Sequence, residues 1–168
     1  MSRRARSVLF AVTASAVALL ATAGATAAEA PDLTTLGWRW PVDTVRIVEP
    51  YAAPPHAYGP GHRGVDLALD GGDVRAPSEG IIAFAGPVAG RGVVTIDHGG
   101  GLVTTLEPVE PLAPTGSSVS RGDLVAARSE GGHTPPGVLH FGVRLDGEYI
   151  NPMLLLGGVP RAVLLPCC

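Results

Sequence analysis

The chain has 168 residues, of which 46% are hydrophobic and 16% charged, and its formal net charge is −3. That length and apolar content suffice for one hydrophobic core and exclude a disordered or fibrous chain. A mildly acidic chain also lacks the basic surface that nucleic-acid binding requires, so we expect no nucleic-acid partner.

Residues 1–27 are predicted to form a secretory signal peptide. Three arginines at positions 3, 4 and 6 precede an apolar run over 8–21, and a small-residue cleavage site follows at 25–27. The run is shorter than the roughly 20 residues that a membrane-spanning helix needs, although an uncleaved signal anchor is the alternative. Cleavage removes three arginines and no acid, which moves the net charge from −3 to −6. We therefore expect a secreted protein of the extracytoplasmic cell envelope, with no membrane span after cleavage.

The rest of the chain is predicted to hold one all-β domain. Residues 28–37 are small, acidic and Pro-containing, which is typical of a short linker; the domain is expected over 38–157 and a C-terminal tail over 158–168. Short Val- and Ile-rich runs punctuated by Gly and Pro indicate strands, and no stretch has a helical period with caps. The predicted strands are 44–48, 81–85, 92–97, 102–106, 138–145 and 149–150, with loops over 107–120 and 129–137.

Three residues form a candidate metal site. His62 and Asp66 lie four residues apart in Gly-His-Arg-Gly-Val-Asp (61–66), and His140 lies in Val-Leu-His-Phe-Gly-Val-Arg (138–144). Two imidazoles and one carboxylate, with a fourth position left for water, are the pattern of a catalytic zinc site. The glycines around His62 permit tight backbone paths that bring both side chains to one ion. The alternative is a solvated loop with an ordinary His and Asp.

Four sequence strings, in this order, resemble the LytM/lysostaphin-type zinc metallopeptidases, which cut peptidoglycan cross-links. They are GHRGVD (61–66), VRAPSEG (74–80), VTIDHGGG (94–101) and VLHFGVR (138–144), and the resemblance runs from about residue 38 to 156. It implies a single β-sandwich of the LytM or duplicated-hybrid-motif type, with Zn²⁺ held by His62, Asp66 and His140. It also implies that the peptide cross-bridges of peptidoglycan are the substrate.

The chain departs from that family at two helper histidines. The family has a histidine two residues before the last ligand, where this chain has Val138, and a second histidine in Tyr-x-His-Leu, where this chain has Pro108. A positioned acid or base contributes about 10²–10⁴ in rate, and each oxyanion stabiliser about 10²–10³. Unreplaced, both losses would leave a barely active enzyme.

Two residues are candidate replacements for the missing histidines. His133 lies on the Gly-rich loop before His140, and a loop histidine with an ordinary pKa near 6.5 suits proton transfer. Glu107 adjoins the Pro108 position, and a glutamate serves as general base at other zinc sites. Solvated loop residues are the alternative for both. His98, in Asp-His-Gly at a predicted strand end, is interpreted as structural.

These observations favour an exported zinc metalloendopeptidase that cleaves peptide cross-links of peptidoglycan. The alternative is a non-catalytic or weakly active envelope protein of the same fold, which binds peptidoglycan or regulates a partner cell-wall hydrolase. Cys167 and Cys168 end the chain, so they cannot form a disulfide framework within the domain, and we predict no catalytic role for them.

Overall fold

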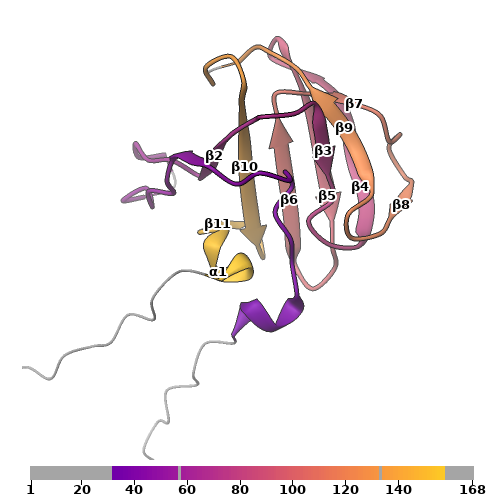
Figure 1. The fold of residues 1–168 in the computed structure, drawn as a ribbon. Helices are drawn as coiled ribbons and strands as arrows, with labels where there is room; N and C mark the ends of the chain where they lie inside the picture. Colours follow the sequence, from indigo (N-terminus) through magenta and orange to yellow (C-terminus); the bar gives the residue numbers. More distant parts are fainter. Residues whose placement is uncertain (1–31, 57, 133, 158–168) are drawn as a thin grey trace, which may run out of the picture. The chain divides into compact units, whose positions relative to one another are not determined.

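The computed structural model describes residues 32–56, 58–132 and 134–157 (Figure 1). The predicted signal peptide, His133 and the tail with its two cysteines lie outside the described residues. Strands dominate the described part, which confirms the all-β prediction. In chain order the elements are η1 (Leu33–Leu36), β1 (Ile47–Glu49), β2 (Gly64–Ala68), β3 (Asp73–Arg75), β4 (Gly80–Val88), β5 (Arg91–Asp97), β6 (Leu102–Glu107), β7 (Val109–Pro111), β8 (Ser118–Val119), β9 (Leu124–Arg128), β10 (Val138–Leu145), β11 (Glu148–Ile150) and α1 (Met153–Leu156).

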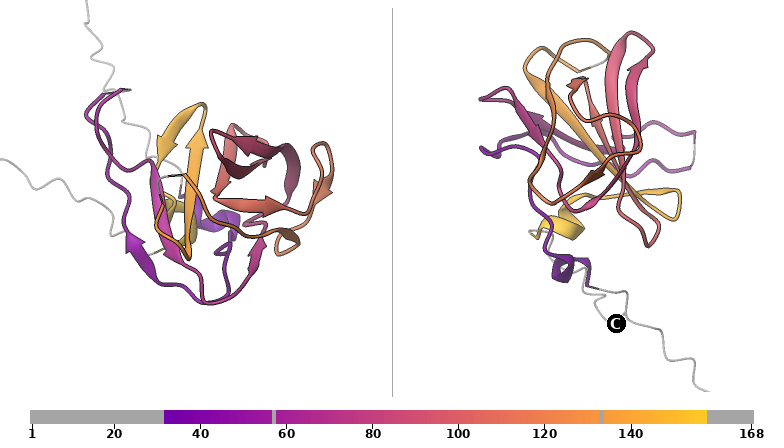
Figure 2. Two further views of the ribbon diagram at one scale, coloured as in Figure 1. Left: turned by 90° about the horizontal axis from the view of Figure 1, so that it is seen from above. Right: turned by 90° about the vertical axis from the view of Figure 1, so that its right-hand side faces the viewer.

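The strands form two antiparallel sheets, which Figure 2 shows from two further sides. The larger sheet has the order β1-β2-β10-β6-β5-β4-β8, with β11 paired to β10, and the smaller sheet has the order β3-β9-β7. β10 therefore lies between β2 and β6, although these three strands are far apart in the sequence. This central position of β10 determines which side chains meet at the site.

Alternation along β10 separates a core face from a site face. Leu139, Phe141 and Val143 are fully buried in the core, so His140 and Gly142 point to the opposite face. The core also takes side chains from β2, β5, β6 and β9, among them Leu67, Val94, Ile96, Leu106 and Val125. A well-packed core on one side holds the backbone under the site in a single register.

The predicted loop over 107–120 is wrong in part, because it contains β7 and β8 and its first residue ends β6. Both short strands lie at a sheet edge. Pro111 ends β7, and an edge strand tolerates proline because one side of its backbone makes no ladder bonds. A Pro- and Ser-rich composition therefore hid two edge strands.

Two single turns of helix were also not predicted. η1 lies within the predicted linker and is capped by the Asp32 carboxylate, which accepts a hydrogen bond from the Thr34 backbone N–H. In α1, Leu155 is buried against the core. Four residues are too few to show a helical period.

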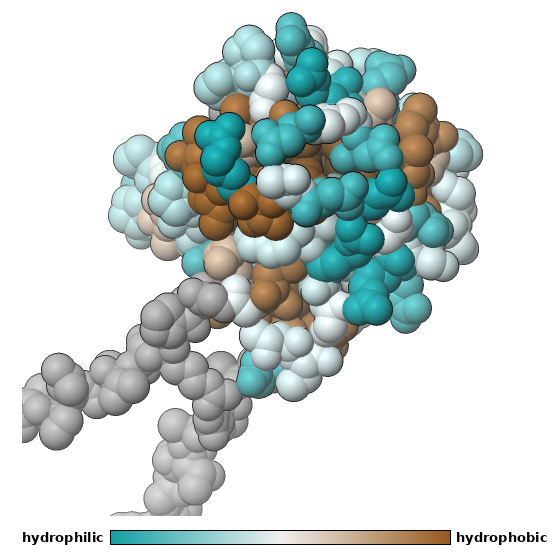
Figure 3. All heavy atoms as spheres, viewed as in Figure 1, coloured by the Kyte–Doolittle hydropathy of each residue, from teal (hydrophilic) through white to brown (hydrophobic). Residues whose placement is uncertain are grey.

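The described surface mixes polar and apolar residues. On the face in Figure 3, hydrophobic side chains are separated by hydrophilic ones and do not form one continuous patch. Within the described residues, no helix is both long enough and apolar enough to cross a membrane.

Candidate metal centre

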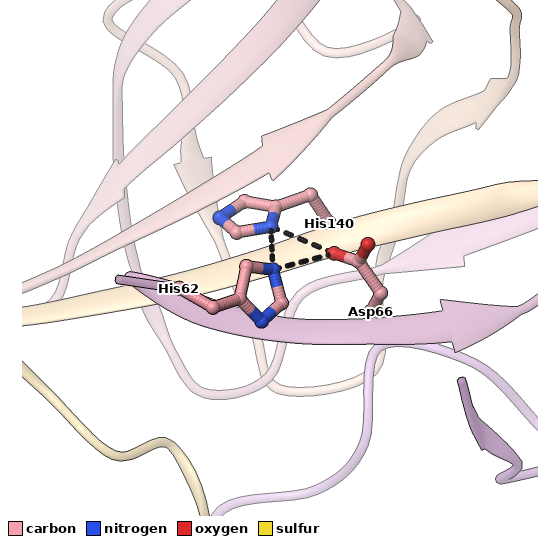
Figure 4. A group of neighbouring side chains, drawn as sticks. All are labelled: His62, Asp66 and His140. Carbon is pink, nitrogen blue, oxygen red and sulfur yellow. Dashed lines mark hydrogen bonds and ion pairs between the residues drawn. The ribbon is translucent and has the colours of Figure 1, made fainter. Parts of the chain in front are cut away.

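His62, Asp66 and His140 converge on one point (Figure 4). His62 Nε2 lies 3.0 Å from Asp66 Oδ1 and 3.1 Å from His140 Nδ1, and His140 Nδ1 lies 2.8 Å from Asp66 Oδ1. Three potential donor atoms from two distant segments thus form a closed triangle. The structure brings together all three of the residues that the sequence predicts as metal ligands.

Strand pairing produces this convergence. Asp66 in β2 and His140 in β10 are directly opposite each other in antiparallel register. His62 precedes β2 and is held by a β-bridge to Ala52, so its side chain lies on the same face as that of Asp66. The four-residue spacing of His62 and Asp66 is therefore that of extended backbone.

A backbone contact fixes the tautomer of His62. Its Nδ1 lies 2.8 Å from the carbonyl oxygen of Pro50. A carbonyl oxygen only accepts hydrogen bonds, so Nδ1 carries a proton and Nε2 is the ring nitrogen that faces Asp66 and His140. In a metal-ligating histidine, the ring nitrogen that does not bind the metal usually donates a hydrogen bond to a carbonyl, a carboxylate or water, which fixes the ring orientation.

Gly64 makes room for the ring of His140. A Cβ at residue 64 would lie 2.5 Å from the carbonyl oxygen of Phe141 and 2.7 Å from His140 Nε2. The sequence predicts that this glycine serves a tight backbone path. Its actual role is steric, because a side chain between His62 and Asp66 on this face would collide with the third ligand.

The Asp66 carboxylate is the electrostatic centre of the triangle. It is only 4% exposed. Burial raises the pKa of its carboxyl, but hydrogen bonds from His140 and His62, with their charges, outweigh burial and hold the pKa below its usual value. Asp66 is therefore an ionised oxygen donor at neutral pH.

The three side chains fit a zinc ion. Tetrahedral zinc with ligand bonds of 2.0–2.1 Å places its ligand atoms about 3.3 Å apart. The observed separations of 2.8–3.1 Å need an adjustment of only a few tenths of an ångström. The donors are two nitrogens and one ionised carboxylate oxygen, which is a set that zinc binds well.

The triangle forms part of the floor of a groove of about 550 Å³. Besides the three ligands, the lining residues are Glu49, Gly61, Arg63, Arg91, Thr105, Glu107, Pro135, Gly142 and Tyr149. A groove of this volume accommodates several residues of a peptide. The three candidate ligands thus border a groove that could hold part of a peptide.

Glu107 also lies in the groove. It ends β6, is directly opposite His140 in the register of β6 and β10, and is 7% exposed. Both oxygens of its carboxylate lie 3.0 Å from Arg91 Nη2. Glu107 is therefore a buried and oriented carboxylate, not the solvated loop residue of the alternative interpretation.

Arg91 was missed by the sequence interpretation. It begins β5, and the β5–β6 register pairs Val94 with Leu106, which makes residues 91 and 107 diagonal neighbours on one face. The Gly99–Gly101 turn marks the centre of this hairpin in the sequence. Folding the sequence about those glycines would have suggested the contact between Arg91 and Glu107.

Tyr149 and Arg63 line the groove, and Arg144 lies over the Tyr149 ring. The guanidinium carbons of Arg63 and Arg144 lie 5.9 and 5.8 Å from the centre of the Tyr149 ring. Tyr149 is 40% exposed and, with Arg63, lines the groove. Arg63 and Tyr149 thus place a cation and an aromatic ring at the groove, beside the candidate ligands.

His98 lies outside the groove and has a structural environment. Its Nδ1 lies 2.6 Å from the Glu79 carbonyl oxygen, its Nε2 lies 2.7 Å from Thr104 Oγ1, and its ring packs on Trp38. Burial lowers the pKa of His98. These contacts agree with its interpretation as a structural residue.

The family model of peptidase family M23 matches residues 60–152. An uncharacterized protein of Mycobacterium tuberculosis is 39% identical over 146 residues, which are 82% of this chain and 57% of that protein. The DD-carboxypeptidase/endopeptidase Mpg of Neisseria meningitidis is 30% identical over 94 residues, 55% of this chain and 22% of that enzyme. A zinc-containing peptidase from Vibrio cholerae has a similar fold, with a TM-score of 0.59 and 23% identity, over 72% of this chain and 40% of that one.

Proposed function

The chain belongs to peptidase family M23, and from that membership and the groove geometry we propose that it is an exported zinc metalloendopeptidase. Its proposed substrates are the peptide cross-links of bacterial peptidoglycan, in the extracytoplasmic cell envelope. The chain spans only 57% of the mycobacterial relative, so the activity of the whole protein is part of the proposal.

One observation carries this proposal: three donor atoms lie within 3.1 Å of one another on the floor of an open groove. His62, Asp66 and His140 would hold the ion. Zinc, when bound, supplies a Lewis acid that polarises a peptide carbonyl and activates water for attack. Structural zinc sites usually have four protein ligands, so a three-ligand set that faces a groove favours catalysis.

Glu107 is the proposed general base. Its carboxylate lies in the same groove, on the strand next to His140. Hydrolysis forms one C–O bond and breaks one C–N bond, with the consumption of one water. Glu107 takes a proton from the attacking water and then gives a proton to the leaving amine, so the carboxylate is regenerated. His133, which lies outside the described residues, is the second proposed proton carrier.

The groove rim supplies substrate contacts in this proposal. Arg63 carries a positive charge, and Tyr149 is a partly exposed aromatic residue of the same groove. Peptidoglycan stem peptides carry carboxylates, which an arginine binds through charge-assisted hydrogen bonds. The named activity of the Neisseria relative, a DD-carboxypeptidase/endopeptidase, supports a peptidase that acts on such peptides.

The test is digestion of purified peptidoglycan by the zinc-loaded protein, with mass spectrometry of the released muropeptides. We expect newly opened cross-links with the wild type and none with His140→Ala. His56→Ala is the matched control, because His56 is exposed and does not line the groove. Absence of release from the folded, zinc-loaded wild type would contradict the proposal.

A second candidate function is favoured by the residues at the helper positions. Val138 and Pro108 stand where the family has histidines, and both carboxylate oxygens of Glu107 contact Arg91. A protein without an available base would bind peptidoglycan or regulate a partner hydrolase of the envelope. Sedimentation with peptidoglycan that is unchanged in His140→Ala, together with no release of fragments, would support this second function.

A further inference from the structure

The Arg91–Glu107 pair lies within the groove but outside the ligand triangle. Arg91 Nη2 contacts both oxygens of Glu107 at 3.0 Å, and Nη1 donates a hydrogen bond to the Val88 carbonyl oxygen at 3.3 Å. The guanidinium is thus fixed at one nitrogen by backbone and at another by the carboxylate. Both side chains are mostly buried, with 20% and 10% exposed.

Such a pair is no more stabilising than an apolar pair of similar volume would be, although loss of one partner leaves the other charge buried and unpaired. Removing two charges from water costs several kcal/mol, which the attraction between them offsets only when all their polar atoms are satisfied. Here the Arg91 Nε is buried and has no hydrogen-bond partner among the described residues. An apolar pair of the same volume would serve the core as well or better, so stability does not account for this arrangement.

The neighbouring loop also accommodates Arg91. A Cβ at Gly132 would lie 2.3 Å from Arg91 Cδ, and a Cβ at Gly131 would lie 3.5 Å from Arg91 Cβ. The loop backbone therefore covers the arginine closely and confines its side chain. The guanidinium of Arg91 is therefore restricted to one position by the Val88 carbonyl oxygen, the loop at residues 131–132 and the Glu107 carboxylate.

We propose that Arg91 is a positioning residue that orients the Glu107 carboxylate toward the metal centre, in place of the helper histidines missing at Val138 and Pro108. This inference rests on the proposed peptidase function. A guanidinium holds a carboxylate at fixed distance and direction, and it leaves lone pairs of both oxygens open to the groove. A fixed base avoids the entropy cost of ordering a free glutamate in the transition state.

A double-substitution cycle tests whether Arg91 acts through Glu107. We expect Glu107→Gln to lower kcat by about 10²–10⁴ and Arg91→Met by about 10–100-fold, as is usual for residues that support a site. The double variant should be no slower than Glu107→Gln alone, and KM should change little in all three. Losses that multiply would mean that Arg91 acts independently of Glu107, and would overturn the inference.

A readout without turnover separates this inference from the proposed function. Urea unfolding of the same variants without zinc should show a coupling between residues 91 and 107 of about tenfold in the unfolding equilibrium constant. All variants should bind zinc as tightly as the wild type. Additive effects on the free energy of unfolding would mean that Arg91 and Glu107 do not interact, and would overturn the inference. An inactive wild type in which the coupling is intact would overturn only the proposed peptidase function.

Matched controls isolate the position of the arginine. Gly132→Ala and Gly137→Ala impose similar backbone strain, because φ is +70° and +78°, but only residue 132 contacts Arg91. Gly132→Ala should therefore lower kcat more than Gly137→Ala does. Arg128→Met, at an exposed arginine of β9 outside the groove, should leave kcat unchanged. Equal activity of the two glycine variants would contradict the confinement of Arg91 by the loop.

Discussion

Gly64 offers the most direct test of how the metal centre is built. In Gly64→Ala, the new Cβ would lie 2.5 Å from the Phe141 carbonyl oxygen and 2.7 Å from His140 Nε2. The carbonyl belongs to the central strand β10 and cannot rotate away, so the two strands must separate or the His140 ring must move. Overpacking of this kind costs about 1–3 kcal/mol. Displacement of a ligand ring also weakens metal binding by about 10–100-fold, as changes to supporting groups do.

The assay pairs thermal unfolding with zinc titration of Gly64→Ala and of Gly142→Ala. A Cβ at residue 142 would lie 3.3 Å from the Arg63 carbonyl oxygen and 3.5 Å from His140 Nε2, which is a far milder contact. We expect a Tm loss of several degrees and weaker zinc binding in Gly64→Ala, and smaller effects in Gly142→Ala. Wild-type zinc affinity and Tm in Gly64→Ala would refute the steric role assigned to Gly64.

Three further outcomes follow from the structure. Asp66→Ala should abolish zinc binding, which calorimetric titration measures, because it removes the ionised donor that both histidines contact. Zinc at 100 times its Kd should raise the free energy of unfolding of the wild type by about 2.7 kcal/mol, and an unchanged Tm would mean that no native site forms. Burial holds the pKa of His98 below 6.5, so the unfolded chain binds more protons below that pH and stability falls as pH decreases. Urea unfolding at pH 7.5 and 5.5 should show a smaller loss in His98→Gln than in the wild type.

The position of Arg91 illustrates what a sequence leaves open. Arg91 and Glu107 are diagonal neighbours across a hairpin whose turn, Gly99–Gly101, is visible in the sequence. The residue types alone give no reason to pair them, because arginine and glutamate are most often solvated. Only the register of β5 and β6 and the loop that covers the arginine make the pair a buried one.

The all-β class, the family and the three residues of the candidate metal centre could all be predicted from the sequence. Metal binding requires particular residue types, and these occur in short motifs around His62, Asp66 and His140 that can be identified without knowledge of the fold. The tertiary structure was needed to show why residue 64 is glycine, that Glu107 is buried in the groove, and that two edge strands lie within 107–120. Each of these depends on which strands pair and in which register, and strand pairing is set by packing between segments far apart in the chain.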